Sequence, residues 1–283
     1  MRPVIEKNKF ETRHVAYIII IVICVIAIGA GVYMQFYQDE KLAVIFGITK
    51  EKEDVELKSL KENFLNNFNN ELNIIKNYDG TILKIKEDKD IITDFYNLQE
   101  QNDNYNVELK IPCFNIKSDS AIKINQKIKD VFYGKSKSIV SSTSTDNTIY
   151  NVKYKAYMND NILSLIILSE LKEGDNNQRI IIKTYNYDLK ENKEATIKDI
   201  ISFQNIDTKQ ANSLIKNIID SSQDENLKLR DLGYPIDVRD SNSDEYKIEN
   251  AKNYYLGDNG YLFLVYPYGN KELTSEMDLV IIR

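Results

Sequence analysis

The feature that most constrains this chain is the run VAYIIIIVICVIAIGAGVY, from Val15 to Tyr33, which contains no charged side chain. At about 1.5 Å per residue, a helix of this length crosses the roughly 30 Å hydrocarbon core of a bilayer. Basic residues predominate before the run, and Asp39 and Glu40 are the first charged residues after it. The positive-inside rule therefore predicts a cytoplasmic tail over residues 1–14, a single membrane helix over 15–36, and an extracytoplasmic remainder.

Two other amino-terminal signals compete with a membrane anchor. A cleaved signal peptide needs an apolar region of about 7–15 residues followed by a small-x-small site. Ala27-Ile28-Gly29 would serve as that site, but the apolar run continues past it. Cleavage stays as the alternative. A lipoprotein anchor is excluded, because the bulky Ile23 precedes Cys24 in the middle of the run.

We expect residues 37–104 to form a juxtamembrane segment of helix and strands, in which an amphipathic helix over about 52–77 follows a short stretch over 38–47. Its apolar side chains recur at steps of three and four, at Leu57, Leu60, Phe64, Phe68, Leu72 and Ile75. This stripe either packs against its own domain or pairs two copies as a homodimer. Only about three heptads are present, which favours packing on the domain.

The rest of the chain reads as an α+β fold on a mainly antiparallel sheet with packed helices. Helices are expected after Ser118, with Ile122, Ile128, Val131 and Phe132 inward, and over 207–220 with a more polar continuation to Leu232. Residues 136–148 and 235–250 read as loops. Alternating or apolar patterns predict strands at TILKIK, IITDFYNL, NVELKIP, TIYNVKYKAYM, ILSLIILSEL, RIIIKTYNYDL, YLFLVYPY and MDLVIIR.

Residues 105–283 carry several segments that together resemble a known family. They are VELKIPCF followed by SAIKINQKIKDVF, NILSLIILSEL followed by IIIKTYNYDLKENKEATIKDII, and the closing GYLFLVYPYGNKEL. These are similar to the extracytoplasmic domain of RsiV-type, lysozyme-sensing anti-sigma factors, a domain that also precedes the catalytic part of PdaC-type peptidoglycan deacetylases. The resemblance implies a cell-envelope domain that senses or binds a lysozyme-like protein or a peptidoglycan fragment.

The chain departs from this family in three places. The turn KEGDNNQR stands where members often carry a Gly-Gly-Ala-His-like sequence, and Pro267-Tyr268-Gly269 replaces a Pro-Tyr-Glu ending. Residues 1–14 are too few to build a domain that holds a sigma factor. We therefore expect a sensor-type exterior without its output half.

Several chemistries are excluded by composition. The single histidine, His14, lies at the cytoplasmic edge of the expected membrane helix, so the exterior has no histidine triad and no histidine metal site. After residue 14 the chain has 33 basic and 41 acidic residues, so it carries a net negative charge. It therefore lacks the basic surface that nucleic-acid binding needs. No cofactor motif is present. Cys113 reads as a small core residue.

Carboxylates leave one enzymatic alternative, a hydrolase of wall glycans that uses two acids at a set separation. Asp188 and Asp199 lie at the end of one expected strand and the start of IKDII, positions similar to those of acids in the family pattern. Acids at such places usually fix turn and cap geometry. We expect that structural role for both.

Tyrosine is the more suggestive residue type, with nineteen in the chain. Tyr185 and Tyr187 share one face of a strand, and Tyr266 and Tyr268 lie near the carboxyl terminus. Exposed tyrosines make good contact surfaces for proteins and sugars, although tyrosine also fills half-buried sheet positions. These four are the candidate binding residues of a non-catalytic envelope domain. A structural partner in an envelope or sporulation complex is the alternative function.

Overall fold

The computed structural model describes residues 58–69, 80, 82–142, 147–231, 238–268 and 276–283. The chain divides into two compact units, Met1–Asn63 and Phe64–Arg283. In the first unit, residues 58–62 are helical and Lys58 pairs with Glu62 one turn on. The expected tail over 1–14 and membrane helix over 15–36 lie outside the described residues. Within the described ranges, no helix is long and apolar enough to cross a membrane.

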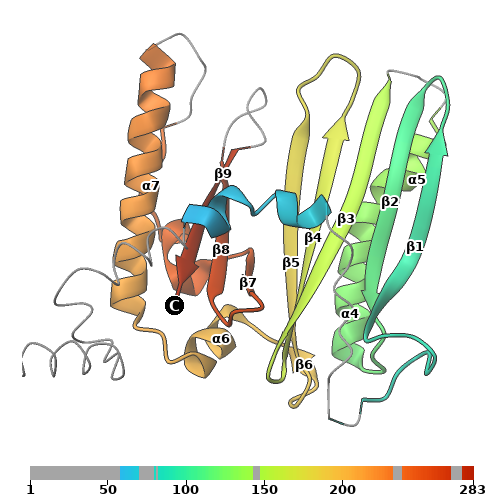
Figure 1. Ribbon diagram of the computed structural model, residues 1–283, viewed down its shortest axis with the longest axis horizontal. Coiled ribbons are helices and arrows are strands. Elements are labelled where there is room, and N and C mark those ends of the chain that lie inside the picture. Colours follow the sequence, from blue (N-terminus) through green and yellow to red (C-terminus); the bar gives the residue numbers. More distant parts are fainter. Residues whose placement is uncertain (1–57, 70–79, 81, 143–146, 232–237, 269–275) are drawn as a thin grey trace, which may run out of the picture. The chain divides into compact units, whose positions relative to one another are not determined.

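The second unit is a mixed α+β fold built on two sheets (Figure 1). The larger sheet has six strands in the order β1 to β6, and every neighbouring pair is antiparallel except β2 and β3. This confirms the predicted α+β class and its mainly antiparallel sheet. The strands are β1 (Ile92–Gln101), β2 (Tyr105–Phe114), β3 (Thr148–Asn159), β4 (Ile162–Lys172), β5 (Arg179–Asp188) and β6 (Lys193–Glu194).

Strand β1 belongs to the same sheet as the predicted domain over 105–283. It pairs with β2 over its whole length, from Ile92 opposite Phe114 to Gln101 opposite Asn106. The expected boundary at residue 105 therefore falls inside a hairpin. The segment TILKIK, expected as a strand, is irregular over its described residues 82–86, and Leu83 and Ile85 are exposed there. An alternating segment becomes a strand only where a neighbouring strand offers hydrogen bonds. Among the described residues, no strand pairs with residues 82–86.

A helical crossover joins the parallel strands β2 and β3. It consists of α4 (Asp119–Ile128), the π-helical turn η2 (Lys129–Tyr133) and α5 (Gly134–Val140). Ser118 caps it as predicted, because its hydroxyl accepts a hydrogen bond from the amide of Ala121 at 3.0 Å. The predicted loop from residue 136 is wrong at its start: Ser136 and Ile139 continue the buried face of the helix as far as Val140.

The crossover covers one face of the large sheet and forms the first core. Its inward side chains are Ala121, Ile124, Ile128 and Phe132, while Ile122 and Val131 are exposed, contrary to the expected apolar side. The sheet contributes the alternate residues of each strand, as period-two geometry requires. Among them are Val107, Leu109, Ile111, Tyr150, Val152, Tyr154, Leu163, Leu165, Ile167, Leu171, Tyr185 and Tyr187.

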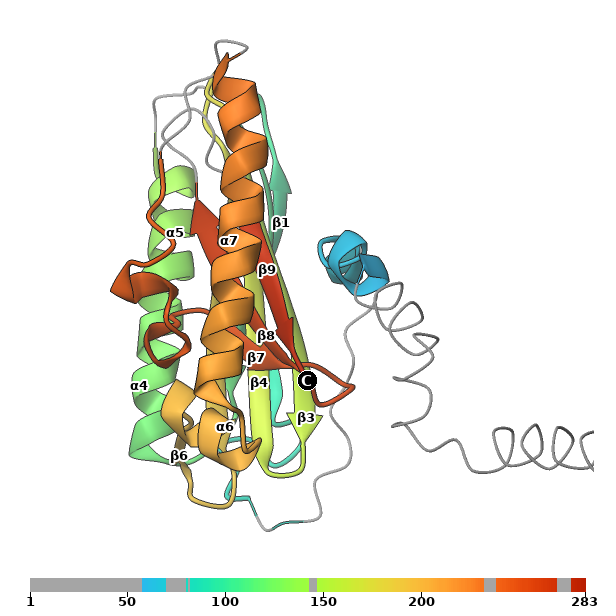
Figure 2. The ribbon, with the colours of Figure 1, turned by 90° about the vertical axis from the view of Figure 1, so that its left-hand side faces the viewer.

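The second sheet has three antiparallel strands, β7 (Tyr254–Leu256), β8 (Leu262–Tyr268) and β9 (Glu276–Ile282). Between β6 and β7 the chain forms α6 (Ile197–Phe203), α7 (Thr208–Asp231) and the short helices η3 (Asp244–Tyr246) and η4 (Ile248–Asn250). Helix α7 lies along this sheet on the side away from the six-stranded sheet (Figures 1 and 2). The second core fills that interface, with Ala211, Ile215, Ile219, Leu256, Leu262, Leu264, Val280 and Ile282 among its residues.

Strand β7, which the sequence did not indicate, joins the two sheets through side chains. The amide of Tyr254 donates to the Thr184 hydroxyl at 2.8 Å, and its carbonyl accepts from the Asn186 amide at 2.8 Å. The amide of Leu256 donates to the Ser164 hydroxyl at 3.1 Å. The Ser164 hydroxyl donates to Asn186 at 2.6 Å. The outer edge of β7 is thus satisfied without a neighbouring strand.

The amino-terminal segment of the unit packs on aromatic rings of the small sheet. In the described part of the predicted helix over 52–77, residues 58–62 are α-helical, a turn follows over 63–65, and η1 (Asn66–Asn69), which includes Phe68, comes next. Phe64 and Phe68 are both 6% exposed, and the Phe64 ring stacks on Tyr255 at 6.4 Å. This part of the apolar stripe packs on its own domain, the interpretation favoured above. A homodimer through 52–77 stays a prediction.

We predict that Ser164→Ala lowers the free energy of unfolding by about 1–3 kcal/mol, because the buried amide of Leu256 loses its acceptor. Ser213→Ala on the exposed face of α7 is the control and should leave stability unchanged or raise it slightly, since alanine favours helices. Urea unfolding measures both. Equal stability of the two variants would contradict the role given to Ser164.

Candidate functional site

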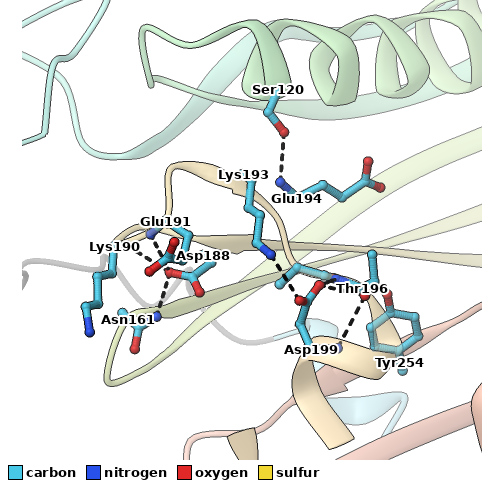
Figure 3. Close-up of polar contacts among 11 residues, drawn as sticks. Ser120, Asn161, Asp188, Lys190, Glu191, Lys193, Glu194, Thr196, Asp199 and Tyr254 are labelled. Carbon is cyan, nitrogen blue, oxygen red and sulfur yellow. Dashed lines mark hydrogen bonds and ion pairs between the residues drawn. The ribbon is translucent and has the colours of Figure 1, made fainter. Parts of the chain in front are cut away.

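Asp188 organises the turn that ends β5 (Figure 3). One of its carboxylate oxygens accepts hydrogen bonds from the amides of Lys190 and Glu191 at 2.9 and 3.0 Å. The same oxygen accepts from the side-chain amide of Asn161, in the β3–β4 turn, at 2.6 Å. Asp188 is 9% exposed. The predicted structural role of Asp188 is confirmed, because its carboxylate stabilises both the turn after β5 and the β3–β4 turn.

Asp199 forms a capping box at the start of α6 (Figure 3). The Thr196 hydroxyl accepts from the Asp199 amide, and the Asp199 carboxylate accepts from the Thr196 amide at 2.8 Å and hydroxyl at 2.6 Å. Lys193 adds an ion pair at 3.0 Å. The Thr196 hydroxyl, with the Thr196 amide and Lys193, lowers the pKa of Asp199. The structural role of this residue is also confirmed.

We predict that Asp199→Asn lowers the free energy of unfolding by about 0.5–1 kcal/mol at pH 7, through the weakened cap. The pKa of Asp199 is lower in the folded chain. Its stabilisation is therefore present above the unfolded pKa of about 3.9 and is lost as the pH falls through the folded pKa. Thermal unfolding should show the deficit at pH 7 and a smaller one at pH 3. Asp160→Asn, at an exposed turn, is the control.

Two of the four candidate tyrosines lie inside the first core rather than on a surface. Tyr185 is 9% exposed and Tyr187 is fully buried beneath α4. The Tyr187 hydroxyl lies 2.6 Å from that of Ser118 and donates to Asn192 at 2.7 Å. They share one face of β5, as expected, but that face is covered by the crossover helix. Tyr185 and Tyr187 therefore fill the core of the sheet and do not form an exposed contact surface.

The other two tyrosines lie elsewhere, on the face of β8 that α7 covers. Tyr266 is 7% exposed and Tyr268 is half-buried. Around them, side chains of α7, β9 and the segment before η3 form a polar group, which we call the Arg239 cluster. Ser222, Gln223, Arg239, Tyr268 and Asp278 contact one another in it. We include Asn226, three residues after Gln223 on α7, and Tyr266, the strand partner of Asp278.

Arg239 is the hub of this cluster. Its guanidinium pairs with Asp278, and both side chains are 7% exposed. It also donates to the Ser222 hydroxyl at 2.9 Å and to Gln223 Oε1 at 3.3 Å, while its backbone amide donates to the same oxygen at 3.2 Å. The guanidinium stacks on the Tyr268 ring at 3.8 Å. These contacts hold a buried charge pair in one arrangement.

Three polar atoms in the Arg239 cluster are buried without a hydrogen-bond partner. They are Nε2 of Gln223, Nδ2 of Asn226 and the hydroxyl of Tyr266, in residues that are 7–8% exposed. Gln223 and Asn226 lie three residues apart and so share a face of α7. Tyr266 lies directly opposite Asp278 in the β8–β9 pairing. Each such atom costs about 1–3 kcal/mol, so three of them on α7 and the strand it covers are unusual.

The sequence signal for this cluster is a change of polarity along α7. Ala211, Ile215 and Ile219 form the apolar face of its first half. The same face continues as Ser222, Gln223 and Asn226. Polar residues at core positions of an amphipathic helix indicate a special environment. The predicted polar continuation of the helix reflects this change, but the partner, Arg239, lies in an expected loop, and no local pattern indicates its contact with α7.

Metal-ligand chemistry has no obvious place in the described part of the chain. Across these ranges, no group of three or more histidine, cysteine, aspartate or glutamate residues converges as a metal site would. Cys113, on β2, is half-buried, and burial raises the pKa of its thiol. Burial likewise raises the pKa of the Tyr266 hydroxyl, so this group is protonated at physiological pH.

Comparisons with known proteins give only distant likeness. No family model matches the chain, and no curated protein matches it. A DUF3298 family protein from Pseudomonas aeruginosa PAO1 is similar in structure, with 10% identity, 65% of this chain and 83% of that chain covered, and a TM-score of 0.39. A second DUF3298 member, from Bacteroides fragilis NCTC 9343, has 13% identity, 63% and 80% coverage, and a TM-score of 0.33. Likeness of this extent carries no argument about function, and the resemblance to RsiV-type domains stays a prediction.

We predict opposite effects of removing two tyrosine hydroxyls. Tyr266→Phe should leave the free energy of unfolding unchanged or raise it by about 1 kcal/mol, because it deletes a buried, unpartnered hydroxyl. Tyr187→Phe should lower it by about 1 kcal/mol, since that hydroxyl bonds Ser118 and Asn192. Denaturant unfolding of the two variants tests the pair. A clear loss of stability in Tyr266→Phe would show that its hydroxyl is satisfied within the folded chain.

Proposed function

We propose that this chain is a membrane-anchored, extracytoplasmic binding domain of the bacterial cell envelope that recognises its ligand without catalysis, through the Arg239 cluster. The three buried, unpartnered polar atoms of Gln223, Asn226 and Tyr266 carry this proposal. Protein interiors rarely leave such atoms unpaired, and a bound ligand group is one partner that would satisfy them. Residues 15–36 would anchor the domain, with residues 1–14 in the cytoplasm.

Binding accounts for this arrangement better than proton transfer does. Arg239 is held by Asp278, Ser222 and Gln223, so the cluster presents fixed donors and a balanced charge pair. A glycan hydrolase would need two free carboxyl groups at a set separation. Asp188 and Asp199, the acids singled out in the sequence, are occupied by turn and cap hydrogen bonds.

The leading ligands come from the sequence resemblance. A lysozyme-like protein or a peptidoglycan fragment fits an envelope domain of the RsiV type, and nucleic acid does not fit the acidic exterior. Of the four tyrosines, Tyr266 and Tyr268 keep a place in this proposal. Their hydroxyls and the Tyr268 ring belong to the Arg239 cluster.

We predict that the full chain, purified in detergent micelles, binds lysozyme or a peptidoglycan digest saturably in calorimetric titrations. The double variant Gln223→Leu/Asn226→Leu should lose that binding at least about tenfold, because the ligand loses its donors. Gln210→Leu makes the same chemical change at an exposed site on the same helix and should bind as the unsubstituted chain does.

The variants also separate a binding role from a packing role. The double variant should remain folded but unfold at a somewhat lower temperature, because it also removes the Gln223 Oε1 acceptor of the Arg239 backbone amide and Nε. A stable double variant that binds both titrants normally would exclude the Arg239 cluster as the site. Failure of the unsubstituted chain to bind either titrant would overturn the proposed function.

A further inference from the structure

We propose that the outer edge of β1 pairs with the same strand of a second copy of this chain, so that the two large sheets join in a two-fold homodimer. This inference concerns a surface separate from the Arg239 cluster and does not depend on the proposed function. It follows from an open edge strand, from the register that two-fold symmetry allows, and from a lysine beside the strand that has no acidic partner among the described residues.

Strand β1 leaves a long edge of the large sheet open. The sheet runs from β1 to β6, and among the described residues no strand pairs with the outer side of β1 (Figure 1). The opposite edge is formed by β6, whose two residues are too few to support strand addition. Strand β1 has ten residues and contains neither lysine nor proline, the residues that commonly protect such edges.

A β-bulge disturbs only the first part of this edge. The pairing of β1 with β2 shifts register between Asp94 and Tyr96, and it is regular from Tyr96 to Gln101. The rings of Phe95 and Tyr96 both contact that of Tyr133 on the crossover, at centroid distances of 5.6 and 4.9 Å. A bulge of this kind protects an edge locally. The regular run that follows it remains available to another strand.

Lys129 places a positive charge beside this run. Its side chain is exposed on η2, and its ammonium lies 5.5 Å from the centroid of the Phe95 ring and 5.9 Å from that of Tyr133. The neighbouring acids Asp94 and Asp130 accept hydrogen bonds from other side chains. Among the described residues, Lys129 therefore has aromatic contacts but no ion pair. An acidic side chain of a partner would complement it.

Two-fold symmetry limits the register of the pairing. Directly opposite residues of an antiparallel pair share one face of the sheet, so one residue of β1 must lie opposite its own copy. Within the regular run, an axis at Leu98 sets Leu98 against Leu98 and Tyr96 against Glu100 of the second copy. An axis at Gln99 would instead set Leu98 against Glu100. We expect the axis at Leu98, because it pairs apolar residues and keeps the acid away from them.

This register also brings opposite charges together. Glu100 of the second copy lies opposite Tyr96, whose ring packs on Tyr133, and Lys129 lies over that ring. Directly opposite residues are about 4.5–5.5 Å apart, which is within reach of a lysine side chain. Oε1 of Glu100 accepts from the Tyr105 hydroxyl, while Oε2 has no partner among the described residues and is open to Lys129. Symmetry forms this ion pair twice in each dimer.

Charge reversal tests the interface in the full chain, purified in detergent micelles. Light scattering gives the mass and the dimer dissociation constant. Lys129→Glu should raise that constant at least about tenfold, because each dimer then holds two like-charged pairs. Lys123→Glu makes the same change at another exposed lysine of the crossover and should have no effect. The double variant Lys129→Glu/Glu100→Lys restores opposite charges and should recover most of the affinity.

A disulfide locates the symmetry axis. With Cys24 and Cys113 replaced by serine, Leu98→Cys should give a covalent dimer under mild oxidation, since directly opposite residues lie within disulfide range. Gln99→Cys, one position further on, should not, because it lies opposite Asn97 of the second copy. Circular dichroism and thermal unfolding establish that each variant is folded.

The outcomes decide the proposal. A monomeric chain overturns it, as does a dimer whose dissociation constant is the same in Lys129→Glu as in Lys123→Glu. Such a dimer would be held elsewhere, for example by residues 15–36 or 52–77. Covalent dimers of Gln99→Cys but not of Leu98→Cys would overturn the assigned register. If Leu98→Cys does not fold, the charge-reversal series decides alone, since its double variant recovers affinity only through a contact between copies.

Discussion

The arrangement of this domain depends on four backbone groups along the outer edge of β7. The amides of Tyr254 and Leu256 and their carbonyls all pair with side chains of the six-stranded sheet, which are Thr184, Asn186, Ser164 and Asn159. A sheet edge normally needs another strand or water. Here polar side chains on the face of β3, β4 and β5 take that role, so the edge of the small sheet is buried against the large one.

This junction determines what the rest of the domain has to cover. Strand β4 becomes buried on both faces, because the crossover helix packs on one and β7 docks on the other. The small sheet then presents its far face to α7, whose first half supplies the matching apolar side chains. The second half of α7 instead packs polar residues against β8 and β9, and Arg239 forms an ion pair with Asp278 on β9. The candidate site therefore lies between α7 and the face of the small sheet that α7 covers.

The consequence for stability is a contrast between two polar clusters. At the β7 junction each buried group has its partner, so the polar residues specify one docking position. In the Arg239 cluster the charge pair is satisfied, but Gln223, Asn226 and Tyr266 retain unpartnered atoms. Unfavourable burial of this kind tends to occur where function requires it, since natural sequences otherwise remove it.

Local patterns in the sequence determined most of the elements and the α+β class. Alternating or continuous apolar runs located β1 to β5, β8 and β9, and Ser118 marked the start of α4, because such patterns and capping are properties of neighbouring residues. Tertiary structure decided the rest. Tyr185 and Tyr187 share a face by local geometry, but only the crossover helix buries it. Strand β7 and the Arg239 cluster depend on residues far apart in the chain, as with Ser164 and Leu256, and no local pattern records such pairs.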